Sequence, residues 1–247
     1  MHSNNENKKV IIASDFDGTL TTRDTLIEFI RYCHGTAGLM LHLLRVSPWV
    51  VLMLLRLYSN HKAKERLLRN CFGGMTQEDL ERRAEDFAHD NQHLLRHTLL
   101  NTIQQAEASG AAVVVITASA ETWVKKMLPS FHVAGTQLEF VDNRFTGRFL
   151  TPNCYGAEKV RRLEECFPLL KTERQKYHVI AYGDSNGDRQ LMEYADESHL
   201  IKGKEEGRTK SKANAGKEQR KNEFASTCPP LNYYSLICNP QFHHRNP

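Results

Sequence analysis

Three short apolar runs, far apart along the chain, constrain the fold of this sequence most. They cover residues 10–13 (VIIA), 112–117 (AVVVIT) and 178–184 (HVIAYGD). Uninterrupted apolar runs of this length are typical of strands that are buried on both faces of a sheet. Helical segments lie between them, one ending at Gly110 and one near 158–170. This alternation predicts parallel βαβ units and therefore an α/β fold with a Rossmann-like parallel sheet.

A long helical segment separates the first apolar run from the other two. Its pattern, in stretches such as KAKERLLRN, predicts an inserted all-helical cap domain over residues 25–99. Residues 9–24 and 100–203 would then form the core, with short strands or a hairpin over 135–151. The low-complexity composition of residues 204–247 predicts a basic, disordered tail.

Most of the net positive charge lies in one segment. The formal net charge is +4, but residues 202–221 hold eight Lys or Arg against three Glu. The folded part is therefore close to neutral, so no nucleic-acid partner is expected. The six cysteines form no CxxC pair and the N-terminus is polar, which predicts reduced thiols, no secretory signal and a cytoplasmic location. No motif implies a protein partner.

Polar side chains follow each apolar run where the strand is expected to end. Ligands of an open parallel sheet bind at the carboxyl ends of its strands, so we expect these side chains to share one site. Each residue alone is compatible with a solvated turn or a surface position, but their joint occurrence favours a site. The set comprises Asp15, Asp17 and Gly18 after the first run, Thr117 and Ser119 after the second, Lys159 in YGAEKVRRL, and Asp184 and Asp188 in GDSNGD.

Several carboxylates with one lysine form a chemically specific combination. Asp15 and Asp17 would repel each other unless a cation or a proton separated them, and Mg²⁺ prefers one or two carboxylates plus water and phosphate oxygens. One aspartate could attack phosphorus, and the other could protonate the leaving oxygen and later activate water. Thr117 and Lys159 would hold the phosphoryl oxygens, because phosphoryl transfer depends mainly on positioning and electrostatics.

Four segments together resemble the ordered motifs of the haloacid dehalogenase superfamily of phosphohydrolases: DFDGTLT, ITAS, the Lys159 segment and GDSNGD. The resemblance covers about residues 9–200, and the helical insertion is similar to the cap of the phosphoserine phosphatase-like class. It implies an aspartyl-phosphate intermediate and Mg²⁺. The implied catalytic roles are nucleophile for Asp15, general acid/base for Asp17, phosphate-binding hydroxyl for Thr117 and charge neutralisation for Lys159. The implied metal ligands are Asp15, the Asp17 carbonyl and Asp184. Asp188 would orient Lys159 or a metal-bound water.

Two branches of that class imply different phosphomonoester substrates, phosphoserine in one and phosphatidylglycerophosphate in the other. Where the phosphoserine branch has a glutamate for the serine amino group, this chain has the shorter Asp24. Gly18, Asp24 and Ser119 are the candidate substrate-binding residues. DFDGTLTTRD, ITAS and CYGAEKV resemble the lipid-phosphatase branch, so we expect a lipid phosphate. Phosphoserine or another small metabolite remains the alternative, as do transfer to an alcohol and a non-catalytic binding module.

Residues 37–58 (AGLMLHLLRVSPWVVLMLLRLY) are unusually apolar for a small cap. Their longest run without a charge or His, residues 46–55, is too short for an ordinary span of ~20 residues. Arg45 and Arg56 flank this run. Three interpretations remain open: a buried cap core, a membrane span, or an interfacial helical hairpin in peripheral contact with lipid at the inner face of the membrane.

Overall fold

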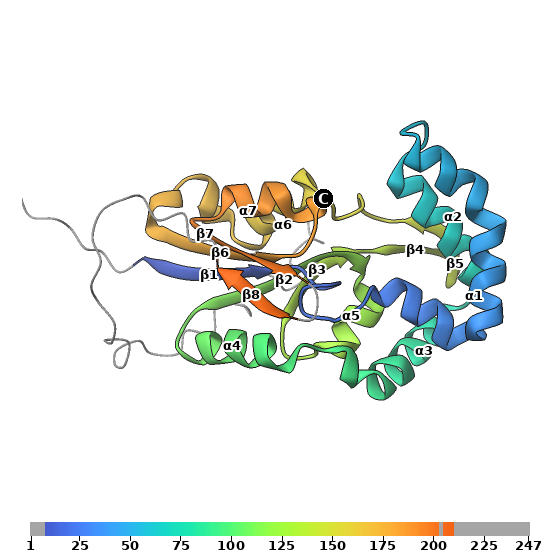
Figure 1. Cartoon of the computed structure of the whole chain (residues 1–247), viewed down its shortest axis with the longest axis horizontal. Helices are drawn as coiled ribbons and strands as arrows, with labels where there is room; N and C mark the ends of the chain where they lie inside the picture. Colours follow the sequence, from blue (N-terminus) through green and yellow to red (C-terminus); the bar gives the residue numbers. More distant parts are fainter. Residues whose placement is uncertain (1–7, 203–204, 210–247) are drawn as a thin grey trace, which may run out of the picture.

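The computed structural model describes residues 8–202 and 205–209 (Figure 1). At its centre lies a six-stranded sheet in the order β3-β2-β1-β6-β7-β8, in which only β7 and β8 pair antiparallel. The predicted α/β fold with a Rossmann-like parallel sheet is confirmed, and the three apolar runs form β1, β2 and β6. The strands are β1 (Lys9–Ser14), β2 (Ala112–Ala120), β3 (His132–Thr136), β6 (Tyr177–Gly183), β7 (Glu197–Lys202) and β8 (Glu205–Thr209).

Helices cover both faces of the sheet, which explains why its central strands are apolar throughout. Successive residues of a strand point to opposite faces. Ile12 of β1 joins a core cluster with α4 (His97–Ala108) and α5 (Glu121–Met127). Ile11 and Ala13 join a second cluster with α6 (Ala157–Cys166) and α7 (Arg189–Tyr194). Short 3-10 helices lie in the connections: η1 (Gln92–Leu94), η2 (Pro168–Lys171), η3 (Arg174–Lys176) and η4 (Asn186–Asp188).

Three further helices lie beyond the carboxyl ends of the strands (Figure 1). They are α1 (Thr25–Leu54), α2 (Asn60–Phe72) and α3 (Gln77–Asp90). Each begins at a side-chain N-cap, supplied by Asp24, Ser59 and Thr76 respectively.

A β-hairpin joins this helical layer. It consists of β4 (Leu138–Val141) and β5 (Arg144–Phe149), within the range where short strands or a hairpin were expected. The Phe149 N–H donates to Glu65 Oε1 of α2 at 2.8 Å, and the Phe145 N–H donates to the Met75 carbonyl at 2.9 Å. Phe145 is buried in the same core cluster as α2 and α3. The inserted helices are therefore completed by a hairpin from a distant part of the chain.

Helix α1 has 30 residues and is interrupted once. Gly35 has φ 69° and ψ 173°, so the segment consists of two helices that meet at a kink. Its length and its mean hydropathy of 1.6 over an 18-residue window are sufficient to cross a membrane. Because buried core helices of soluble proteins meet the same criterion, this property alone decides nothing.

The first residues of the segment 204–247, which was expected to be a disordered tail, form a strand in the structure. Residues Glu205–Thr209 form β8, which pairs with β7. Backbone hydrogen bonds to β7 need no apolar side chains, so composition gave no sign of this strand. The rest of that expectation lies outside the described residues.

Candidate active site

The polar residues of the three central strands meet at one edge of the sheet. Asp15 directly follows β1, Asp184 directly follows β6, and Thr117 and Ser119 lie in the last part of β2. The turn after β1 needs Gly18, whose φ is +73°, because a Cβ there would lie 2.1 Å from Asp184 Oδ2. The absence of a side chain at this position lets two strand ends approach closely.

Lys159 joins two of the carboxylates. Its Nζ lies 2.5 Å from both Asp15 Oδ1 and Asp188 Oδ1, and its side chain is 2% exposed. Burial opposes the ammonium charge, but the two neighbouring carboxylates raise the pKa of Lys159. Lys159 therefore stays positively charged although it is buried.

Asp15 and Asp188 differ in the groups that stabilise their ionised carboxylates. Asp188 Oδ2 accepts hydrogen bonds from the N–H groups of Asp184 and Ser185 and from the Ser185 hydroxyl. Burial opposes its charge, but Lys159 and these donors keep the pKa of Asp188 below its usual value. The second oxygen of Asp15 accepts from Thr19 Oγ1 at 3.3 Å, and burial raises the pKa of Asp15 to about 7 despite Lys159. Asp15 thus keeps its charge less readily than Asp188 does, and a further cation would stabilise the charged form of Asp15.

The Asp17 carboxylate is held by neutral donors. Its Oδ1 accepts from the Thr25 N–H at 2.7 Å and the Thr25 hydroxyl at 2.6 Å, and its Oδ2 accepts from the Ser119 hydroxyl at 2.5 Å. Burial, followed by the charge of Asp24, raises the pKa of Asp17, and the hydrogen bonds oppose this rise. A raised pKa favours the protonated form that a general acid needs.

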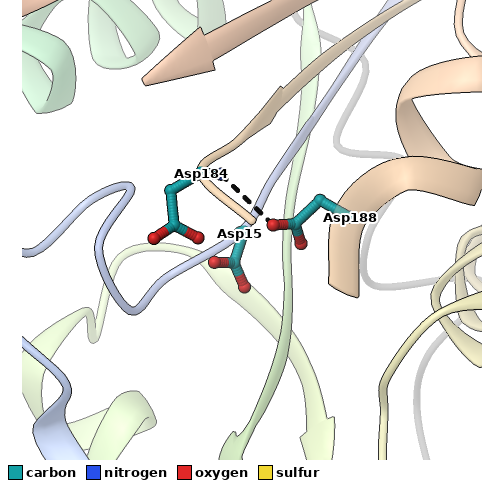
Figure 2. A group of neighbouring side chains, drawn as sticks. All are labelled: Asp15, Asp184 and Asp188. Atoms are coloured by element: carbon teal, nitrogen blue, oxygen red, sulfur yellow. Dashed lines mark hydrogen bonds between the residues drawn. The ribbon is translucent and has the colours of Figure 1, made fainter. Parts of the chain in front are cut away.

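Asp15, Asp184 and Asp188 form a cluster that fits a hard cation (Figure 2). One carboxylate oxygen from each lies within 4.8 Å of the others. Burial raises the pKa of Asp184, as does the charge of Asp188, so Lys159 alone does not balance the cluster. Oxygen ligands with excess negative charge suit Mg²⁺. Asp188 accepts four hydrogen bonds, from Lys159, the Asp184 N–H and two groups of Ser185, whereas Asp15 accepts two, so Asp15 and Asp184 are the better candidates for direct ligands.

Three further predicted site residues, Thr117, Ser119 and Asp24, each form a hydrogen bond in the structure. Thr117 is fully buried, and its hydroxyl oxygen accepts from the Ser119 N–H at 3.0 Å. Ser119, predicted to bind substrate, donates its hydroxyl to Asp17 at 2.5 Å. Asp24, also predicted to bind substrate, uses Oδ1 to cap α1 by accepting from the Ile27 N–H at 3.1 Å.

Two residues that sequence reasoning missed support Asp17. Thr25 contacts it directly, and the Trp123 indole Nε1–H donates to Thr25 Oγ1 at 3.0 Å. Both side chains are buried. A threonine next to a helix cap and a tryptophan in an apolar stretch are common, so neither carried a signal in the sequence.

The chain resembles known proteins in sequence and in structure. The chain is 30% identical over 203 residues to Protein CicA of Caulobacter vibrioides, covering 79% of this chain and 88% of CicA. A Bordetella pertussis protein of unknown function has a similar structure, with a TM-score of 0.67, 19% identity, and coverage of 78% of this chain and 89% of the other. A structure of phosphoserine phosphatase titled as a phospho-aspartyl intermediate analogue has a TM-score of 0.52, 17% identity, and coverage of 78% and 86%.

These structural similarities show a shared fold. The sequence model of a family also shows family membership, because it matches residues 12–193, a range that contains every candidate site residue. The predicted family and the prediction of a hydrolase are therefore confirmed: this chain belongs to the haloacid dehalogenase-like hydrolases.

Proposed function

We propose that this protein is a Mg²⁺-dependent phosphomonoester hydrolase that works through an aspartyl-phosphate. The observation that carries the proposal is the buried Asp15 carboxylate, bonded to Lys159 at the carboxyl edge of the sheet, with Asp17 held two residues further on. Similarity in fold to phosphoserine phosphatases supports it. The presence of every motif residue argues against a non-catalytic binding module.

The residues would divide the reaction into two displacements. A carboxylate oxygen of Asp15 attacks phosphorus, the bond from phosphorus to the ester oxygen breaks, and Asp17 protonates the leaving alcohol. Ionised Asp17 then removes a proton from water, which attacks the acyl phosphate, releases inorganic phosphate and restores Asp15. Lys159 would balance the charge on the phosphoryl oxygens in both steps, and the Thr117 hydroxyl would donate a hydrogen bond to one of them.

Asp15, Asp184 and the Asp17 backbone carbonyl would hold the metal ion. When bound, Mg²⁺ would supply positive charge to the phosphoryl group and to the Asp15 carboxylate. Asp188 would keep Lys159 in place through its 2.5 Å contact.

A lipid phosphate such as phosphatidylglycerophosphate is the substrate we favour. Two observations support it: the exposed apolar surface of α1, and the use of the Asp24 carboxylate as a helix cap. This substrate is compatible with a cytoplasmic protein that binds the inner face of the membrane peripherally. Phosphoserine or another small metabolite is the alternative. The ratio of kcat/KM for a lipid phosphate in detergent to kcat/KM for phosphoserine decides between them.

The covalent step is tested by trapping the phosphoenzyme. Acid quenching during turnover of a soluble ester should leave a mass increase of one phosphoryl group on the peptide that contains Asp15. Asp15→Asn should abolish both this adduct and Mg²⁺-dependent turnover. The matched control is Asp142→Asn, the same change in the exposed turn between β4 and β5, where φ is 48°. Turnover by Asp15→Asn at the control's rate would disprove the proposed nucleophile.

A further inference from the structure

The second part of α1, after the kink at Gly35, carries large apolar side chains on two opposite sides. One side faces the protein: Leu39 and Val46 are buried, and Leu43, Trp49 and Val50 pack against the core cluster. A helix that is apolar on opposite sides is normally covered on both of them, either by protein or by lipid. In this protein the opposite side is uncovered.

The uncovered side carries a concentration of exposed apolar side chains. Thirteen large apolar residues are exposed in the described part of the chain, and eight of them lie between residues 40 and 57. Leu44, Leu54 and Leu57 are each at least 70% exposed. Contiguous exposed apolar surface of this kind marks an interaction site. We call this set the α1 outer face; it consists of Met40, Leu41, Leu44, Val51, Leu52, Leu54, Leu55 and Leu57.

The end of α1 presents leucines in a defined turn. The Leu57 N–H donates to the Leu52 carbonyl at 2.8 Å, and the Arg56 N–H donates to the Met53 carbonyl at 2.9 Å. This pair of bonds is a Schellman closure, with Arg56 at φ 60° in the position that glycine usually takes. The turn therefore places Leu55, Arg56 and Leu57, all exposed, at the corner between α1 and α2.

The charge around this face identifies the kind of partner. No Asp or Glu lies between Glu28 and Glu65, whereas Arg45, Arg56 and Lys62 are exposed and form no ion pair within the described part. An apolar helix face bordered by Arg and Lys is the composition of helices that lie in the interface of anionic membranes. A second copy of this chain would instead bring the same cations against one another.

The rest of α1 argues against a membrane span. Its first turn is part of the active site, because Thr25 bonds to Asp17, and Phe29 and Ile30 are fully buried. Beyond the kink, Leu39 and Val46 are buried against the protein. A span would remove both of these side chains from the core cluster. A helix that lies along the membrane surface keeps the inner side on the protein and covers the outer side with lipid.

We propose that the α1 outer face docks on the surface of an anionic lipid bilayer, with the leucines of the α1–α2 corner inserted among the acyl chains and the neighbouring cations at the phosphate level. In Figure 1 this part of α1 runs along the edge of the molecule that is farthest from the sheet. The docking surface does not depend on the proposed hydrolysis, but it would bring the enzyme to a lipid phosphate.

Flotation of the full chain with vesicles tests the proposal. The probes are vesicles of phosphatidylcholine alone and vesicles that also contain phosphatidylglycerol. The test variant is Leu54→Ser/Leu55→Ser/Leu57→Ser. The matched control is Leu150→Ser/Leu169→Ser, which removes exposed leucines outside the α1 outer face. The basic C-terminal segment is the same in all proteins, so its contribution cancels.

We expect the wild type and the control to float with anionic vesicles, and the test variant to bind them at least tenfold more weakly. All three should hydrolyse a soluble ester at the same rate, which separates failure of docking from failure of the proposed chemistry. Equal flotation of the test variant and the wild type would overturn the proposal. So would resistance to carbonate extraction, which indicates a span, or a dimer that the leucine changes dissociate, which indicates a second copy.

Discussion

The Asp17 carboxylate is held in place by a chain of side-chain contacts. Its carboxylate receives three hydrogen bonds from Thr25 and Ser119. The Thr25 hydroxyl donates to Asp17, and its oxygen also accepts a bond from the Trp123 indole N–H. Trp123 therefore acts on Asp17 through Thr25, as a positioning residue.

Replacing Trp123 with Phe tests this chain of contacts. The change removes the indole N–H and keeps an aromatic ring, so Thr25 loses a bond worth ~1 kcal/mol and its hydroxyl is held by one contact fewer. We expect kcat on a soluble ester with a poor leaving group to fall by about fivefold, the rate equivalent of that bond, with KM unchanged. Phe29→Leu is the control, because Phe29 stacks on Trp123 at 5.0 Å without taking part in the bonds. It should lower Tm more than kcat. Equal losses of kcat in both variants would mean that Trp123 serves packing alone.

Asp184 and Asp188 should respond differently to the same substitution. In Asp184→Asn a hard anionic ligand becomes neutral, so the Mg²⁺ concentration for half-maximal activity should rise at least tenfold, on the order of one lost charge-assisted contact. In Asp188→Asn the contact with Lys159 weakens, so kcat should fall at saturating Mg²⁺ with a smaller change in the Mg²⁺ titration. A Mg²⁺ titration of each variant gives the result. The reverse pattern would place the metal nearer Asp188.

At the scale of elements, the sequence predicted the strands that are buried on both faces and missed those at the margins. The runs in β1, β2 and β6 are continuous because helices cover both faces. β7 reads ESHLIK and has one buried residue, so its polar content resembles a loop. The kink in α1 was also missed, since a single glycine inside a helical pattern gives a weak signal.

In the candidate site, the positions of residues could be predicted from the sequence, whereas the contacts between their side chains could not. Residues at strand ends could be predicted because parallel strands bring their carboxyl ends to one edge. Contacts between side chains could not, because Trp123 and Thr25 are 98 positions apart and only the packing of α5 against α1 brings them together. The contact of Ser119 with Asp17 likewise depends on the rotamer that the fold selects.

The connection that precedes β7 gives a prediction about stability and pH. Asp196 Oδ2 accepts from the Val179 N–H and from Arg174, each at 2.8 Å. Burial opposes its charge, but these contacts keep the pKa of Asp196 below its unfolded value. A lowered folded-state pKa gives stability that is present above the unfolded pKa of ~3.9 and is lost as pH falls through the folded pKa.

We therefore expect Asp196→Asn to lower Tm at pH 7 by roughly 2–4 °C, the effect of about 1 kcal/mol in a domain of this size. The difference from wild type should shrink when pH falls below ~3.9, because wild-type Asp196 is then protonated as well. Thermal unfolding at both pH values measures this. Glu173→Gln, in an exposed pair with Lys176, is the control and should change little. A difference that grows in acid would contradict the assignment.

At the scale of the whole molecule, α1 connects the two surfaces on which the proposals rest. Its first turn holds Asp17 through Thr25, and its far end carries the leucines of the α1 outer face. The kink at Gly35 lies between these parts. One helix therefore fixes the position of the active site relative to the proposed membrane surface, so docking should affect which substrates reach the site and leave the chemistry unchanged.

This arrangement predicts that the form of the substrate decides the effect of the leucine changes. With a lipid phosphate presented in anionic vesicles, Leu54→Ser/Leu55→Ser/Leu57→Ser should lower kcat/KM at least tenfold, in proportion to lost vesicle binding. With the same lipid dispersed in detergent micelles, the loss should be small, because the substrate then diffuses to the enzyme. Steady-state assays of both forms, with Leu150→Ser/Leu169→Ser beside them, give the comparison. An equal loss in vesicles and micelles would show that the leucines contact the substrate itself. No loss in either would show that the α1 outer face has no part in substrate access.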